Sequence, residues 1–150
     1  MGLNPEFEGR SFPLAAPYLV AREKIREFAD AVGATDPAYL DPAAARALGH
    51  PDVIAPPTFG IVLSMTAGRQ VVADPELGLD YTRVVHGEQR FVIARPIRAG
   101  DRLTVTVTVE NIRAAAGNDM ITTRGDVTTV DGEPVFTAYS TLVARGTAGG

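Results

Sequence analysis

The chain has 150 residues, with 14 Lys and Arg against 18 Asp and Glu, and it contains no Cys. A chain of this length is most simply one domain, residues 1–150, and can bury roughly 70% of its unfolded surface without a metal or a disulfide. The net charge of −4 argues against a nucleic-acid partner. The lack of Cys excludes disulfides, thiolate metal sites and Cys nucleophiles, and we expect neither a metal nor a cofactor.

The N-terminal letters MGLNPEFEGR lack the apolar core of a signal peptide. No apolar stretch reaches the length of about 18 residues that spans a membrane. We therefore expect a cytoplasmic protein with no membrane span.

The first half of the chain shows helix and loop signals. Ile25, Phe28, Ala29 and Val32 recur at helical spacing and predict one apolar helix face, and Gly33 is a natural helix end. A proline-rich loop follows over residues 34–57, with a short helix expected at the letters PAAARAL.

Residues 56–74, PPTFGIVLSMTAGRQVVAD, predict a second helix that is apolar on most sides and therefore buried on most sides. Pro56 and Pro57 suit its first turn, where a backbone N–H has no partner within the helix.

After residue 80 the apolar period changes to two, which predicts strands at 83–97, 101–114, 119–130 and 133–145. Leu103, Val105, Val107 and Val109 should share one buried face. Four antiparallel strands after one buried helix favour an α+β hot-dog fold, a sheet wrapped around a long central helix. The alternative is an open α+β sandwich of the same elements. The polar tail 145–150 is expected to fray.

Residues 33–42 read GATDPAYLDP. This loop resembles the signature of the MaoC-like family of (R)-specific hydratases and dehydratases, G-D-x-N-P-x-H, which is often continued by x-D-P. Residues 53–58, VIAPPT, are similar to the family's helix start, P-I-V/A-H-G-M, and residues 95–101, RPIRAGD, to its P-x-x-x-G-D strand and turn. The resemblance runs over roughly residues 10–145. It is nearest to the N-terminal, dehydratase-like half of the family, which includes the A subunit of the mycobacterial (3R)-hydroxyacyl-ACP dehydratase.

The resemblance implies a hot-dog protein that adds or removes water across a double bond conjugated to a thioester. In such enzymes a loop Asp and His act as the acid/base pair, and a backbone N–H at the helix start stabilises the thioester oxygen. Here the Asp position is Ala34, the His position is Tyr39, and the helix-start Gly position is Pro57, which has no N–H. We therefore expect the scaffold of this active site without its reactive groups.

Other ionisable residues have mainly structural interpretations. Asp36 is expected to cap the turn before Pro37, His50 to lie at the surface, and Asp101 to sit in a hairpin turn. His86 is expected to bond to backbone, with a role at a dimer seam as the alternative.

Five residues are candidates for an acyl-binding pocket. Phe59, Leu63 and Met65 are expected in the core, with an acyl tunnel as the alternative, and Thr58 is either a pocket hydroxyl or a first-turn helix residue. Ile54 completes the set.

Three functions remain open from the sequence. By resemblance, the chain is the acyl-binding half of a heterodimer whose catalytic MaoC-like partner supplies Asp and His, acting on acyl-ACP or acyl-CoA thioesters. The second is a homodimer that binds an acyl thioester or another apolar ligand without converting it. The third is an enzyme that uses Asp36 or His86 in new roles. The letters VVHGEQRF predict a long edge strand through which either dimer forms.

Overall fold

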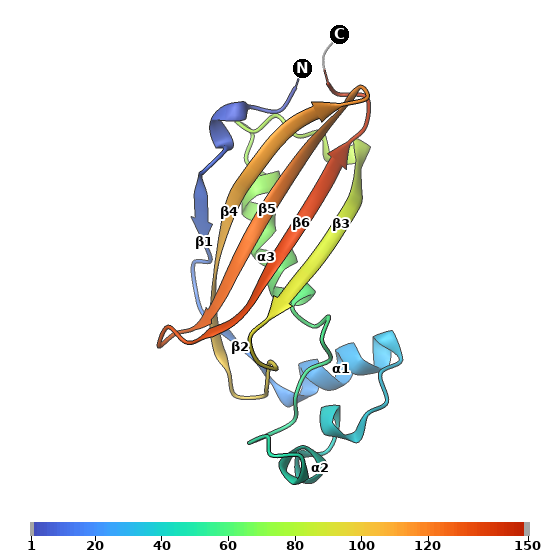
Figure 1. Cartoon of the computed structure of the whole chain (residues 1–150), viewed down its shortest axis with the longest axis vertical. Coiled ribbons are helices and arrows are strands. Elements are labelled where there is room, and N and C mark those ends of the chain that lie inside the picture. Colours follow the sequence, from blue (N-terminus) through green and yellow to red (C-terminus); the bar gives the residue numbers. More distant parts are fainter. Residues whose placement is uncertain (1, 149–150) are drawn as a thin grey trace.

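A computed structural model describes residues 2–148 and contains one antiparallel sheet of six strands (Figure 1). The four long strands are β3 (Val84–Ile93), β4 (Arg102–Ala115), β5 (Asn118–Thr129) and β6 (Pro134–Ala144). Their order in the sheet is β4-β5-β6-β3, with β1 (Ser11–Pro13) and β2 (Tyr18–Leu19) both paired to the outer side of β4. The four predicted strands are confirmed. β1 and β2 were not predicted, because strands of three and two residues are too short to show an alternation of apolar and polar residues.

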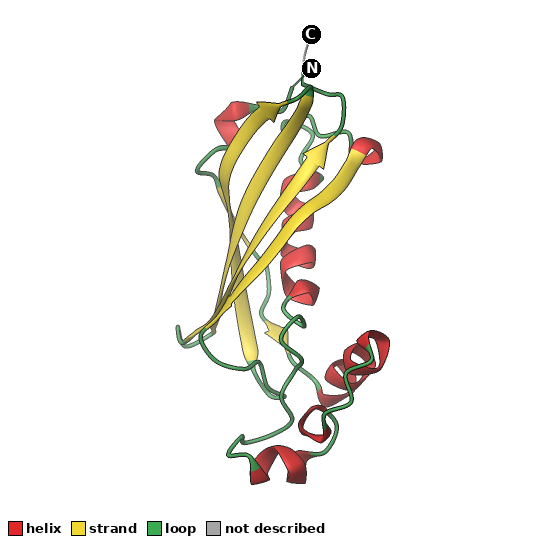
Figure 2. Ribbon diagram, turned by 45° about the vertical axis from the view of Figure 1, so that its right-hand side comes forward, coloured by secondary structure: helices red, strands yellow, loops and turns green. Residues whose placement is uncertain are grey.

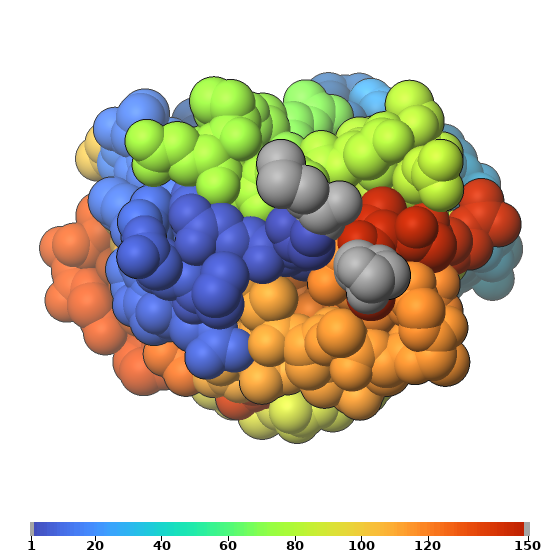
Figure 3. Space-filling model, turned by 90° about the horizontal axis from the view of Figure 1, so that it is seen from above, coloured from blue at the N-terminus to red at the C-terminus, as the bar shows by residue number. Residues whose placement is uncertain are grey.

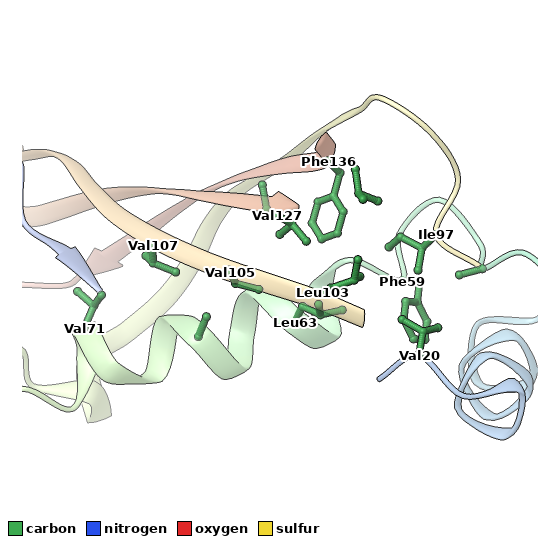
Figure 4. Packing of buried hydrophobic residues seen from close by; sticks show 14 of the residues in the cluster. Val20, Phe59, Leu63, Val71, Ile97, Leu103, Val105, Val107, Val127 and Phe136 are labelled. Carbon is green, nitrogen blue, oxygen red and sulfur yellow. The ribbon is translucent and has the colours of Figure 1, made fainter. Parts of the chain in front are cut away.

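Helix α3 (Ile61–Val72) lies along one face of the curved sheet (Figure 2). Its Leu63, Ala67 and Val71 form a buried stripe that faces the buried side of β4, where the predicted alternation of apolar residues is confirmed (Figure 4). This arrangement is the predicted α+β hot-dog fold. The expectation of burial on most sides of the helix is wrong for the single chain, because Thr66, Arg69 and Gln70 are exposed and Met65 is 52% exposed.

The predicted start of α3 is also wrong. The helix begins at Ile61, after a turn that contains Pro57 and Thr58, so neither residue lies in its first helical turn. The physical reason is a strand-like contact just upstream: the Ala55 N–H donates to the Ile97 carbonyl at 2.7 Å. The chain must be extended at Ala55 and needs the following turn to change direction before the helix can form.

Helix α1 (Arg22–Val32) ends at Gly33, whose φ of 70° is the left-handed conformation that favours glycine. Ile25 and Ala29 are fully buried, as predicted, but Val32 is 53% exposed and does not share their environment. Val32 lies in the last turn, beyond the surface on which the helix packs. The short helix α2 (Pro42–Ala47) is confirmed and is capped by Asp41, and both helices lie at one end of the sheet (Figure 1).

The first and last described segments meet at the opposite end of the sheet (Figure 3). There the Thr147 hydroxyl donates to the buried Asp119 carboxylate at 2.7 Å. Of the tail expected to fray, residues 149–150 lie outside the described residues. Within residues 2–148, no helix is long and apolar enough to cross a membrane.

Candidate functional site

Three segments that are distant in the sequence meet at the start of α3. The loop after α1 contacts residues 53–55 through the Ile54 N–H, which donates to the Ala38 carbonyl at 3.1 Å. Residues 53–55 in turn pair with the β3–β4 connection, where the Ala99 N–H donates to the Val53 carbonyl at 3.0 Å. These are the three segments that resemble the family motifs, so the fold brings all of them to one place.

An apolar cavity of about 150 Å³ opens where these segments meet. We call it the first cavity. No Asp, Glu, His, Lys or Arg side chain lines it, and Tyr39 is the one titratable group in its wall. The lining residues are Tyr39, Ile54, Ala55, Pro56, Pro57, Gly60, Ile93, Pro96, Ile97 and Phe136.

The three positions matched to the family's reactive groups do not form an acid/base site. Tyr39 and Pro57 line the first cavity, whereas Ala34 does not and its N–H is bonded to the Ala29 carbonyl at the end of α1. At the start of α3, the N–H groups of Ile61 and Val62 donate to carbonyls of the preceding turn, so they are committed to the helix start.

The other candidate ionisable residues lie away from the first cavity. The Asp36 carboxylate accepts the Ala38 N–H at 2.9 Å and so caps the turn. His86 lies on β3, is exposed, and its ring nitrogen donates to the Glu88 carbonyl oxygen at 3.0 Å. His50 follows α2 and its backbone N–H donates to the Ala45 carbonyl. Within residues 2–148, no group of three His, Asp or Glu side chains could hold a metal ion.

The five pocket candidates separate into different environments. Ile54 lines the first cavity, whereas Met65 lines a second cavity of about 160 Å³ between α3 and the sheet. Phe59 and Leu63 are at most 1% exposed and belong to the core. Thr58 is exposed. None of these last three lines either cavity.

One residue that the sequence did not single out shapes the first cavity. The ring of Phe136 is 4% exposed and lies so close to Gly60 that a Cβ on that glycine would be 2.8 Å from the ring. Phe91 meets the same ring edge-on, with ring centroids 6.2 Å apart. Phe136 therefore fixes the floor of the first cavity against the start of α3. The backbone angles of Gly60 are ordinary right-handed ones that any residue can adopt, so it is the close packing of the ring that requires glycine there.

A largely buried ion pair supports the loop that carries Pro96 and Ile97, two lining residues of the first cavity. The Arg95 guanidinium donates two hydrogen bonds to the Asp101 carboxylate, at 2.9 and 3.0 Å. Asp101 also accepts the Arg98 N–H at 3.0 Å, and Arg95 reaches Glu133 at 2.6 Å. The hydrogen bond with Asp101 raises the pKa of Arg95 above its ordinary value. Asp101 is therefore more than a turn residue: it closes the loop that carries Pro96 and Ile97.

The hot-dog fold and the loop geometry at the start of α3 define a dehydratase-like protein of the MaoC type. The chain belongs to the family described as FAS1-like, dehydratase domain region, whose model matches residues 6–138.

Solved structures agree with this membership. A chain of the truncated HadBC (3R-hydroxyacyl-ACP dehydratase) complex from Mycobacterium tuberculosis is 33% identical with a TM-score of 0.84, over 91% of this chain and 96% of that one. A MaoC-like dehydratase is 37% identical with a TM-score of 0.86, over 93% of this chain and 42% of that one. An R-hydratase from Pseudomonas aeruginosa shares the fold. It is 22% identical with a TM-score of 0.69, over 92% of this chain and 81% of that one. Among sequence relatives, a UPF0336 protein from Streptomyces coelicolor is 61% identical over 145 residues, 97% of both chains.

Proposed function

We propose that this chain is the acyl-binding subunit of a (3R)-hydroxyacyl-thioester dehydratase, and that a second MaoC-like subunit supplies the catalytic Asp and His. The substrate would be an acyl thioester of acyl carrier protein or coenzyme A. The similarity to a chain of a (3R)-hydroxyacyl-ACP dehydratase complex supports this assignment.

The observation that carries the proposal is the lining of the first cavity. The three family segments enclose a pocket, yet its wall offers no carboxylate and no imidazole. Dehydration needs one group to take the α-proton and one to protonate the leaving hydroxyl. The hydroxyl of Tyr39 does not replace this pair, because a phenol is a poorer general base than a carboxylate or an imidazole. The wall is instead suited to hold an apolar group away from water.

The exposed edge of β3 supports association with another subunit. β3 is the last strand in the sheet order, so one of its sides has no partner strand. It also exposes Val85, Val92 and Ile93, at 40%, 52% and 46%. A long edge strand with apolar side chains is a surface that proteins normally cover. We propose that this edge pairs with the catalytic subunit to form one continuous sheet.

The same edge also favours the second candidate function, a homodimer that binds an acyl thioester without converting it. In a homodimer β3 would pair with β3 of a second copy, and neither copy would bring an acid/base pair. The two functions differ in assembly and in activity, because only the heterodimer converts substrate.

The test is co-expression of this chain with a MaoC-like subunit from the same genome that carries an intact G-D-x-N-P-x-H loop. Light scattering would give the assembly, and the loss of enoyl-thioester absorbance would give hydration. We expect a heterodimer that is active, and loss of both assembly and activity in a Val92→Lys variant. The matched control is Leu48→Lys at the end of α2, where the side chain is 65% exposed and far from β3 in sequence; this variant should assemble normally. A stable, inactive homodimer that does not bind the second subunit would favour the second candidate function, a homodimer that binds an acyl thioester without converting it.

A further inference from the structure

The second cavity lies between α3 and the sheet and shares no lining residue with the first. Small residues create its space on both sides: Gly68 of α3, and Gly125 and Ala138 on neighbouring strands. A Cβ at Gly68 would meet nothing within 4 Å, and one at Gly125 would meet only ordinary contacts near 3.8 Å. The packing of the protein itself therefore does not require either glycine.

A row of polar side chains crosses this cavity. Gln89 on β3 pairs with Ser140 on β6, which pairs with Thr123 on β5. Residues directly opposite in an antiparallel sheet point to the same face, so all three share the cavity side, and all three line the cavity. Apolar pairs flank the row on both sides, with Gly125 opposite Ala138 and Ile121 opposite Leu142.

The Gln89 side-chain nitrogen, Nε2, is buried and has no hydrogen-bond partner within residues 2–148. Buried polar groups in proteins are nearly always satisfied, and a single unsatisfied donor is unfavourable. The cavity wall contains no carboxylate, and its Ser64, Thr123 and Ser140 hydroxyls make no hydrogen bond with Nε2. A ligand oxygen bound in the cavity would supply the missing acceptor.

We propose that the second cavity binds the tail of an acyl chain that carries a keto or hydroxyl oxygen within its length, and that this oxygen accepts a hydrogen bond from Gln89. The apolar pairs beside the polar row suit the hydrocarbon on either side of the oxygen. A charged group fits poorly, because the two lining residues that can carry positive charge, Arg69 and His86, are both exposed and an unpaired buried charge is costly. An uncharged oxygen is therefore the acceptor that best suits the Gln89 side-chain nitrogen.

This inference rests on the proposed function, since it takes the ligand to be an acyl thioester. Gly60 of the first cavity lies just before α3, and Gly68 of the second cavity lies within it. A separation of eight residues corresponds to about 12 Å along a helix. The selective oxygen would therefore lie well away from the thioester, in the middle or far part of the chain.

The test uses neutral ligands and this chain alone. N-acetylcysteamine thioesters of dodecanoic acid, each with one keto group moved stepwise along the chain, have the same composition and differ only in position. Calorimetry should find one isomer, with its keto group at a particular position, that binds about tenfold more tightly than isomers with the keto group further along the chain. A tenfold difference in affinity is what one well-formed hydrogen bond contributes. The Gln89→Met variant keeps the length of the side chain without its amide and should bind all positions equally. Gln70→Met, the same change at an exposed residue of α3 outside both cavities, should keep the preference.

A second variant guards against misfolding of Gln89→Met. Gly125→Val fills the cavity floor and should weaken every positional isomer by at least about tenfold, because the tail loses its space. Four outcomes would overturn the inference: equal affinity for all positions in the wild type, a preference that survives Gln89→Met, unchanged binding in Gly125→Val, or no binding at all. Equal affinity for all positions would mean that water alone satisfies Gln89. Because no turnover is measured, these outcomes are independent of whether a catalytic subunit restores activity.

Discussion

Replacing Gly60 by Ala tests the packing that shapes the first cavity. Gly60 is the residue just before α3 and has right-handed backbone angles that alanine accepts, so backbone strain does not oppose the change. Here, however, the new methyl group would lie 2.8 and 2.9 Å from two carbons of the Phe136 ring. That ring is 4% exposed and packs against Phe91, so any shift of the ring disturbs packing that is already tight.

We expect Gly60→Ala to destabilise the fold by about 1–3 kcal/mol, the usual cost of overpacking a core. Gly68→Ala is the matched control on the same helix, because its methyl group would meet nothing within 4 Å; it should stabilise by roughly 0.5–1 kcal/mol. Urea unfolding followed by circular dichroism measures both changes. Adding Phe136→Leu to Gly60→Ala should recover part of the loss. If Gly60→Ala stabilises the protein as much as Gly68→Ala does, the assigned contact between Gly60 and Phe136 is wrong.

Two further predictions concern charged groups. Asp101→Ala should cost about 3 kcal/mol or more in urea unfolding, because it removes the buried carboxylate of Arg95 and leaves only the half-exposed Glu133 as its partner. Glu133→Ala, at a side chain 52% exposed, should cost less than about 1 kcal/mol. Equal losses would contradict the assignment. The hydrogen bond from Arg22 lowers the pKa of Asp52 in the folded state. The pair should therefore stabilise the fold fully above the unfolded pKa of about 4, and this stabilisation should be lost as the pH falls through the lowered folded pKa. The melting temperature of Asp52→Asn should accordingly fall below that of the wild type at neutral pH and match it in acid, and a difference that persists unchanged in acid would refute this linkage.

Much of the secondary structure could be predicted because the signals are local. Gly33 ends α1 for a reason that resides in one residue, its left-handed backbone. The alternation in β4 is likewise readable from Leu103 to Val109 and is confirmed by their burial. In both cases neighbouring residues alone contain the information.

Other features depend on contacts between distant residues and could not be predicted. The helical period around α3 could not reveal that pairing of Ala55 with Ile97 delays the helix to Ile61. The order of elements could not reveal that β3 pairs with β6 rather than with β4. The edge position of β3 itself was predicted from the letters VVHGEQRF and is confirmed.

The candidate site shows the same division. The sequence located its three segments, but the cavity they form also depends on Phe136, which is far from all of them along the chain. Ile54 lies before α3, in the segment that pairs with the β3–β4 connection, and lines the first cavity. Within α3, the side of the helix decides that Met65 lines the second cavity and Leu63 lies in the core. A replacement such as Leu63→Trp would therefore test core packing and not an acyl channel.

The most direct test of the proposed function is hydration of a short (2E)-enoyl thioester, followed by loss of absorbance, with this chain alone and with a MaoC-like subunit that carries the intact loop. Because general acid/base groups contribute about 10²–10⁴-fold in rate, we predict that the chain alone is at least about 10²-fold slower than the mixture. The double variant Ala34→Asp with Tyr39→His should remain slow on its own, since Pro57 still provides no N–H. Rapid turnover by the unpartnered wild-type chain, lost on His86→Ala or Asp36→Asn, would contradict the proposal and place the chemistry outside the first cavity.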